Sequence, residues 1–528
     1  MGTQKMARVT VIALLLTCLV LQAVAQDSLR TSPPGKVPAA ATPYSPAAGE
    51  TAETLGPSSA QFSDETPLSE ATETVVPEPI PEEVISSEII APTNAAPPFD
   101  WSRFRLGGQY RILPNASNFG FHSPVIRDNT PSQFLFLQRM RLWLTYNPTE
   151  NVEGYIQMQV GQVPWGAGYD FNKSFTAGGT PVTGDHVGIL LRRSWLAVKN
   201  DTYGVIRAGI LDWHDSFGDT MASADYDFNM GGIEWKKEFT DLNKLVIKSA
   251  MLLLNDKAFN QASVNPGPNS AYLYAWDLDQ PIGEKHSVGF SAYYLSDRGG
   301  YSYSNVGPYT SSWDTWFGAR AKLGFDRIPI SGFILANNGK RDNVGPVDFT
   351  HSGWATQLQI GAIEIGPGKL SMQGLYASGG NGNTTGHSGE FRTLAQSYRD
   401  NYGAQGYWSY LHLTSPNGPG DISDLGVGLQ NRGLGLATTQ IKYEYPLTQK
   451  LVGITAGGWL RSATANPHSG STNMGTELMQ QFTYDFGGNM KLDVGTAVLF
   501  TGNFYRDGLA GPPPSDLYEA FSRLQLEF

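Results

Sequence analysis

The chain ends with Tyr518-Glu519-Ala520-Phe521-Ser522-Arg523-Leu524-Gln525-Leu526-Glu527-Phe528, and this stretch decides the fold. From Arg523 onward, polar and apolar residues alternate strictly. Because successive side chains of a β-strand point to opposite faces, every second residue shares a face. The apolar face carries Leu524, Leu526 and Phe528. The pattern therefore predicts a strand with hydrocarbon on one side and water on the other.

The start of the chain predicts export. Lys5 and Arg8 precede the short apolar run 9–20, and Ala23-Val24-Ala25 fits a small-residue cleavage site. This pattern is typical of a secretory signal peptide over residues 1–25, too short and wrongly flanked to be a membrane helix. The single cysteine lies inside it, so the mature chain is expected to have no disulfide or thiolate chemistry. No other segment approaches the ~18 consecutive apolar residues of a membrane helix.

An exported chain of this kind is periplasmic, secreted or a membrane β-barrel, and its composition favours the barrel. The sequence contains 60 Gly, 25 Phe, 24 Tyr and 12 Trp, but only 16% charged residues. Glycine suits tight turns, and aromatic residues form the girdles at both bilayer interfaces. The final Phe528 also resembles the terminal signal that the assembly machinery reads in bacterial outer-membrane barrels, which implies that machinery as a partner.

Residues 26–98 differ from the rest of the chain. They contain 11 acidic residues, two basic residues and 13 prolines, and they account for most of the formal net charge of −11. Such a segment cannot bury enough apolar surface to offset its ordering entropy, so we expect a disordered periplasmic linker. Two interpretations stay open: a tether that reaches the cell wall or a partner, and a plain solvated spacer.

Residues 99–528 are expected to form an all-β fold, a transmembrane antiparallel β-barrel of about 18 strands. An even number is typical of bacterial single-chain barrels. Short turns alternate with long loops, the longest of which, 379–433, is a candidate to fold over or into the mouth. The predicted strands are 104–112, 134–146, 152–163, 187–199, 203–211, 228–238, 244–254, 271–279, 286–295, 315–325, 330–338, 353–365, 369–378, 434–445, 450–462, 474–485, 490–501 and 518–528.

Strand parity predicts a basic lumen, because an arginine on the lipid face near the midplane costs ~2–4 kcal/mol. In strand 187–199, Arg192 and Arg193 are adjacent and so occupy both faces. The candidate pore-lining residues are Arg105, Arg111, Arg139, Arg141, Arg193, Arg207, Lys248, Arg320, Lys322, Lys442, Arg461 and Arg523.

Two interpretations of this basic lining compete. Rings of Arg and Lys can attract carboxylates or phosphates and make a pore anion-selective. Alternatively, the cations form a structural ladder with acidic residues that are also predicted to face inward. These are Glu153, Glu234, Glu444, Asp493, Glu519 and Glu527.

Two stretches resemble the alginate-export family of outer-membrane barrels (porins). One is Phe136-Leu137-Gln138-Arg139-Met140-Arg141-Leu142 followed by Ile156-Gln157-Met158-Gln159, and the other is Leu191-Arg192-Arg193-Ser194-Trp195-Leu196 followed by Val205-Ile206-Arg207-Ala208-Gly209. The resemblance spans 101–528 and implies an 18-stranded barrel whose arginine-lined lumen conducts an anionic uronate polymer. Arg139, Arg141 and Arg207 match recurring basic positions of that family. Arg193 departs from it, since relatives often carry an acidic residue there.

Asp212, Asp215 and Asp219 surround His214 and are candidate ligands for Ca²⁺; the alternative is an ordinary Asp-rich turn. No G-x-S-x-G turn, C-x-x-C-H haem motif or phosphate-binding loop is present, so we expect neither an enzyme nor a further cofactor nor a nucleic-acid partner.

The sequence thus predicts a porin of the bacterial outer membrane that conducts small anionic solutes or a polyuronate and contacts membrane lipid. One alternative is a structural anchor or surface protein with a plugged pore, whose N-terminal extension binds the cell wall or a partner. Another is a lipid-degrading enzyme in the barrel wall.

Overall fold

The computed structural model describes residues 100–118, 133–164, 189–222, 229–256, 270–298, 309–325, 328–343, 348–380, 386–394, 427–506 and 516–528. The strands are β1 (Phe104–Ser117), β2 (Gln133–Thr149), β3 (Val152–Pro164), β4 (Ile189–Asn200), β5 (Gly204–Leu211), β6 (Met230–Phe239), β7 (Leu245–Asp256), β8 (Ser270–Ile282), β9 (His286–Asp297), β10 (Tyr309–Phe325), β11 (Ile328–Asn343), β12 (Phe349–Ile365), β13 (Gly368–Ala377), β14 (Gly386–Ser388), β15 (Leu436–Pro446), β16 (Leu451–Arg461), β17 (Asn473–Gly487), β18 (Met490–Thr501) and β19 (Leu517–Glu527). Short 3₁₀ helices are η1 (Trp101–Arg103), η3 (Thr240–Leu242), η5 (Asn431–Gly433) and η6 (Asn503–Tyr505). Across these ranges, no helix is both long and apolar enough to cross a membrane.

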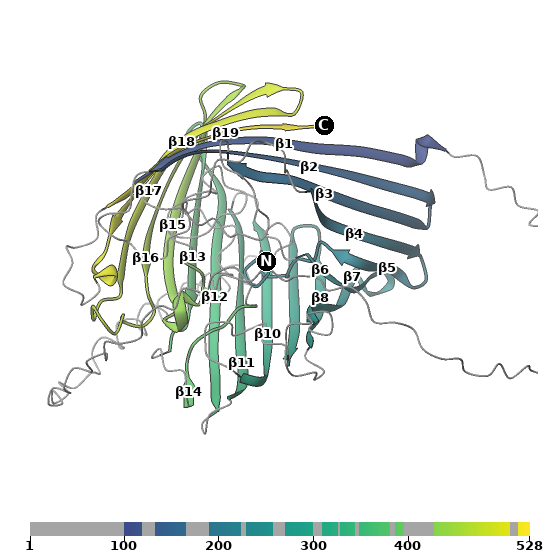
Figure 1. Ribbon diagram of the computed structural model, residues 1–528, viewed down its shortest axis with the longest axis horizontal. Coiled ribbons are helices and arrows are strands. Elements are labelled where there is room, and N and C mark those ends of the chain that lie inside the picture. Colours follow the sequence, from purple (N-terminus) through teal and green to yellow (C-terminus); the bar gives the residue numbers. More distant parts are fainter. Residues whose placement is uncertain are drawn as a thin grey trace, which may run out of the picture. The chain divides into compact units, whose positions relative to one another are not determined.

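The strands form one closed antiparallel barrel (Figure 1). Each wall strand pairs with its neighbour in sequence, and β19 pairs with β1 to close the ring. The three-residue strand β14 is the exception, because it pairs in parallel with β12 while β13 pairs directly with β15. The wall therefore has 18 strands, which confirms the predicted fold class.

All eighteen predicted strands lie on wall strands of the barrel. The observed strands are often longer, mostly at the ends that lead into the long loops: β11, for instance, extends to Asn343 rather than to residue 338. The predicted signal peptide 1–25 and linker 26–98 lie outside the described residues and stay predictions.

The closing seam joins the two ends of the barrel sequence. Gly108 and Phe528 exchange two backbone hydrogen bonds, at 2.8 and 3.0 Å. The ring of Phe528 lies directly over Gly108, because a Cβ placed on this glycine would come within 2.4 Å of the ring atom Cζ. The terminal aromatic residue thus fills a space that only glycine leaves open.

The outer wall is apolar. Large hydrophobic side chains that alternate with inward residues are exposed there, such as Leu106 (72%), Leu196 (65%) and Phe290 (59%). Near the tight turns, aromatic pairs such as Phe104 with Tyr146 lie together, with ring centroids 4.4 Å apart. In hydrocarbon every backbone polar group needs a partner within the protein, and closure of the sheet supplies it. A closed barrel with an apolar belt is the architecture of a β-barrel that spans a lipid bilayer.

We predict that Gly108→Leu weakens the closing seam, since the leucine must displace the Phe528 ring. Overpacking of this kind costs about 1–3 kcal/mol. The measurement is the thermal unfolding of refolded protein, followed by its heat-modifiable migration on a gel. Gly231→Leu is the matched control, because a Cβ at this position in β6 meets no atom within 4 Å. Equal stability of the two variants would contradict the prediction, whereas recovery in Gly108→Leu/Phe528→Ala would support it.

Candidate functional site in the barrel lumen

A group of arginines lines the inner face of β1 and β2. Arg111 lies opposite Arg139 across the β1–β2 pair, and Arg141 lies opposite Gln159 across the β2–β3 pair. Arg139 Nη2 donates to Gln109 Oε1 at 3.0 Å, and Arg141 Nε donates to Gln159 Oε1 at 2.8 Å. An amide oxygen can accept from a guanidinium without cancelling its charge. These two contacts therefore orient the two guanidinium groups.

β4 contributes two further arginines because it carries a β-bulge. Gln157 pairs with Arg193, whereas the next residue of β3 pairs with Leu191, so Arg192 is an extra residue in β4. Arg192 Nη1 donates to Gln159 Oε1 at 3.2 Å, and Arg193 Nε donates to the side chain of Asn229 at 2.8 Å. A bulge places two residues opposite one and re-aims a side chain. Both arginines consequently reach the lumen, although simple alternation puts them on opposite faces.

We call Arg111, Arg139, Arg141, Arg192 and Arg193 the basic wall. All five come from three strands, β1, β2 and β4. Arg111 and Arg139 are only 1% and 6% exposed, so their charges lie deep in the barrel interior. Arg105 lies on the same inner face, nearer to the tight-turn rim, and is exposed.

Most of the other predicted cations on the inner face lie beside carboxylates. Arg207 contacts Glu234 at 2.8 Å and Asp212 at 2.6 Å, and Lys248 contacts Glu234 at 3.6 Å. Glu234 thus bridges two cations from neighbouring strands.

The same arrangement recurs farther around the barrel. Arg320 contacts Asp279 at 2.6 Å, and Arg523 contacts Asp493 at 2.7 Å. Lys442 lies 3.9 Å from Glu444, while Lys322 is exposed on the inner face of β10. For the paired residues, the structure fits the interpretation as a ladder of ion pairs.

Arg461 differs from the expected position, because it lies on the outer face. It pairs with Ala437, whose inward neighbours are Leu436 and Thr438, and its guanidinium lies 5.2 Å from the ring of the outward Trp459. Arg461 is the last residue of β16, at the loop end of the strand. The cost of a lipid-facing arginine falls to ~0–1 kcal/mol near the interface. The rule that an arginine must face the lumen therefore does not hold at this end of the strand.

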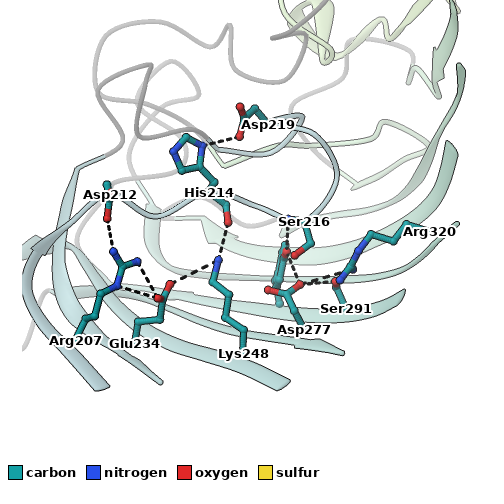
Figure 2. A network of polar contacts seen from close by, with 11 residues as sticks. Arg207, Asp212, His214, Ser216, Asp219, Glu234, Lys248, Asp277, Ser291 and Arg320 are labelled. Carbon is teal, nitrogen blue, oxygen red and sulfur yellow. Dashed lines mark hydrogen bonds and ion pairs between the residues drawn. The ribbon is translucent and has the colours of Figure 1, made fainter. Parts of the chain in front are cut away.

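The segment 212–222, which follows β5, folds into the barrel (Figure 2). Its apolar side chains Trp213, Phe217 and Met221 are fully or almost fully buried. The Phe217 ring fits against Gly318 of β10, where a Cβ would come within 2.5 Å of the ring, and lies 5.4 Å from the ring of Phe333.

Two polar networks tie this segment to the wall (Figure 2). On one side, Lys248 Nζ donates to the carbonyl of His214 at 2.9 Å. On the other, the backbone amide of Ser216 donates to the Tyr293 hydroxyl at 3.1 Å, and that hydroxyl donates to Asp277 at 2.9 Å. The segment is thus attached to strands β7, β8 and β9 by hydrogen bonds as well as by apolar contact.

Asp215 organises the segment internally. One carboxylate oxygen accepts from the amide of Phe217 at 2.6 Å, and the other accepts from the amides of Met221 and Ala222 at 2.5 and 2.7 Å. Burial raises the pKa of Asp215 to about 6, because desolvation disfavours the charged form more than these three amides favour it.

The predicted calcium ligands do not converge. Asp212 contacts Arg207, Asp215 accepts from backbone amides, and Asp219 lies 2.8 Å from Nδ1 of His214. Within the described residues, no group of three metal-ligating side chains is assembled. The three carboxylates instead shape the segment and fix it to the wall.

Described parts of the long loop 379–433 also lie inside the barrel. Phe391, Leu394 and Leu429 are fully buried and share one apolar cluster with inward side chains of the wall. Trp316 Nε1 donates to the carbonyl of Arg392 at 2.7 Å, and the Arg392 amide donates to Asn337 at 3.1 Å. Within the described residues the buried members of this cluster lie on strands from β4 to β17, and the partly buried Tyr155 of β3 packs against it. The apolar cluster therefore adjoins the basic wall at β3 and β4.

Sequence reasoning missed several charged residues of the interior. Arg341 and Arg392 lie 5.1 and 5.2 Å from the ring of Phe349, and His351 lies 2.8 Å from Asp314. Arg341 follows the inward alternation of β11, so a longer predicted strand would have found it. Arg392 lies in a loop, where no periodicity marks an inward position.

Comparison with protein-family models finds no match, and comparison with curated proteins finds none either. Solved structures of Pseudomonas aeruginosa proteins do match. OccK8 (OprE) is 12% identical, with 81% of this chain and 98% of that chain covered and a TM-score of 0.45. OpdL is 10% identical, with 81% and 99% covered and a TM-score of 0.47. The outer membrane protein OpdK is 9% identical, with 80% and 98% covered and a TM-score of 0.46. At these identities no residue role is transferred from them.

We predict that the attachment of segment 212–222 weakens as the pH rises. The attached state has the higher pKa, about 6 against 3.8, so it binds more protons than a detached state does. Attachment is therefore strongest below pH 4 and declines as the pH passes 6, by on the order of 3 kcal/mol in total.

Hydrogen exchange measures this directly. After correction for the intrinsic pH dependence of exchange, the protection of the Phe217, Met221 and Ala222 amides should fall by about tenfold or more between pH 4 and pH 7. Amides of the β18–β19 pair serve as the internal reference. Constant or rising protection of the three amides would refute the pH dependence.

Proposed function

We propose that the protein is an outer-membrane channel that conducts small anionic solutes along the basic wall. The observation that carries this proposal is the clustering of five arginines on the inner face of β1 to β4. Arg139 and Arg141 are oriented by contacts with Gln109 and Gln159. Fixed positive charges inside a low-dielectric wall attract anions and raise their local concentration.

The geometry also favours one side of the lumen as the path of the solute. Arg207, Arg320 and Arg523 lie next to carboxylates. Inward segments pack on apolar residues of wall strands between β4 and β17. A solute passing through the lumen is then attracted toward β1 to β4, where Arg141 and Arg193 are the partly exposed guanidiniums that its carboxylate or phosphate groups can contact.

A uronate polysaccharide is the finer form of this proposal. Its repeating carboxylates match a row of arginines better than a single small anion does, and the resemblance to the alginate-export family points the same way. The Arg193 position makes this wall more basic than the pattern of that family. The proposal includes assembly through the terminal Phe528.

Reversal potentials in planar bilayers under a KCl gradient test the selectivity. We expect wild-type protein to favour chloride, and Arg141→Gln/Arg192→Gln to lower the anion-to-cation permeability ratio several-fold, toward one. Arg461→Gln is the matched control, since this arginine lies on the outer face and should leave the ratio unchanged. A wild-type ratio at or below one would remove the proposal.

Oligouronates distinguish the polymer from small anions. They should block the current of wild-type channels in a concentration-dependent way that weakens with added salt, while neutral oligosaccharides of equal length should not. Block by both kinds of sugar would indicate size exclusion alone and would exclude uronate recognition.

The inward segments favour a second candidate, a structural anchor whose pore is plugged. Phe217 and Phe391 are almost completely buried inside the barrel, as expected of a filled interior. Single-channel recording separates the two functions: well-inserted protein with near-zero conductance supports the anchor, and stable open currents support the channel.

A further inference from the structure

The lipid-facing wall of β8 to β11 contains an apolar groove of about 530 Å³. Cross-strand pairing explains its shape. One row across the sheet runs Trp276, Ala292, Phe317, Ala336, and the next row runs Leu278, Phe290, Ala319, Ile334. Alanines alternate with large side chains in the first row, and Ala319 lies between Phe290 and Ile334 in the second. The alanines form the floor, and the large residues form the sides.

The large residues stand well out of the wall. Trp276, Phe290, Phe317 and Ile334 are 49–59% exposed, so they project into the surroundings rather than pack down over the alanines. The groove is several times larger than the ~150 Å³ cavity that accommodates one benzene molecule. Water is a poor occupant, because an apolar site gives it none of the two to four polar partners that it needs.

A polar row marks one end of the groove. Tyr274, Tyr294, Thr315 and Asn338 pair across the same strands, one step farther from the tight turn that joins β10 to β11. Tyrosines and polar side chains lie at the level of lipid headgroups. Tight turns mark the periplasmic rim of such barrels, so this row lies at the outer leaflet.

We propose that this groove binds one acyl chain of an outer-leaflet lipid, which in a bacterial outer membrane is a lipopolysaccharide. The groove is continuous with the lipid-facing belt, which selects hydrocarbon as its occupant. The chain enters below the polar row and runs along the alanine floor. The aromatic walls hold it through many weak dispersion contacts, so its residence exceeds that of the surrounding lipid.

Native mass spectrometry of protein extracted in a mild detergent tests this site. Wild-type protein should retain one lipopolysaccharide molecule. Ala319→Phe fills the floor between Phe290 and Ile334 and should lower the occupancy at least five-fold. Ala437→Phe is the control, since this alanine also faces outward but lies on β15, outside the groove. Heat-modifiable migration shows whether each variant is folded, and Ala336→Phe replaces Ala319→Phe if the latter does not fold.

Three results would overturn the proposal. Equal lipopolysaccharide occupancy in wild-type and floor-filled protein would show that the groove does not hold the lipid. A retained phospholipid would remove the assignment to the outer leaflet. A dimer that the floor variant dissociates would show that a second copy of the chain occupies the groove.

Discussion

Backbone amides and carbonyls that lie in hydrocarbon must find their partners within the protein, and the rest of the structure depends on this constraint. A sheet meets it only by closing, and here β19 closes against β1. The seam ends in the two backbone hydrogen bonds between Gly108 and Phe528, with the aromatic ring over the glycine. Closure fixes an inside and an outside for each wall strand. The alternation of side chains then becomes a division between lipid and lumen.

Within the lumen, charge and covering loops are distributed unevenly. The segment 212–222 and the described parts of 379–433 pack on inward apolar residues of strands between β4 and β17. Arg207 of β5, Lys248 of β7 and Arg320 of β10 lie among carboxylates and support the fold of those segments as much as they line a path. β1 to β4 present arginines oriented by Gln109, Gln159 and Asn229. The proposal that solutes pass near β1 to β4 rests on this clustering of arginines.

Strand positions were predictable because each wall strand sees lipid on one face and a wet interior on the other, which imposes alternation. The prediction ended early at residue 338 of β11, since the strand continues to Asn343 where the outer face leaves hydrocarbon and no longer needs apolar residues. The inward position predicted for Arg461 was wrong for the same reason, because this arginine also lies near the edge of the hydrocarbon.

The inward position of Arg192 depended on a bulge, which is a feature of pairing with β3 and not of β4 alone. The inward folding of Asp215 and Phe217 depends on contacts with Tyr293, Gly318 and Phe333, far away in sequence.

The bulge at Arg192 also bears on how such a barrel can change. Inserting one residue into a regular strand moves every later side chain to the opposite face. Residues that faced the lumen then face hydrocarbon, and the lipid-facing residues then face water. β4 absorbs its extra residue locally: Leu191 and Leu196, on either side of it, both still face outward. A wall strand can therefore gain an inward cation by insertion while its lipid-facing side chains stay apolar. During evolution, such barrels can acquire new charge in the lumen without changes to their lipid-facing surface.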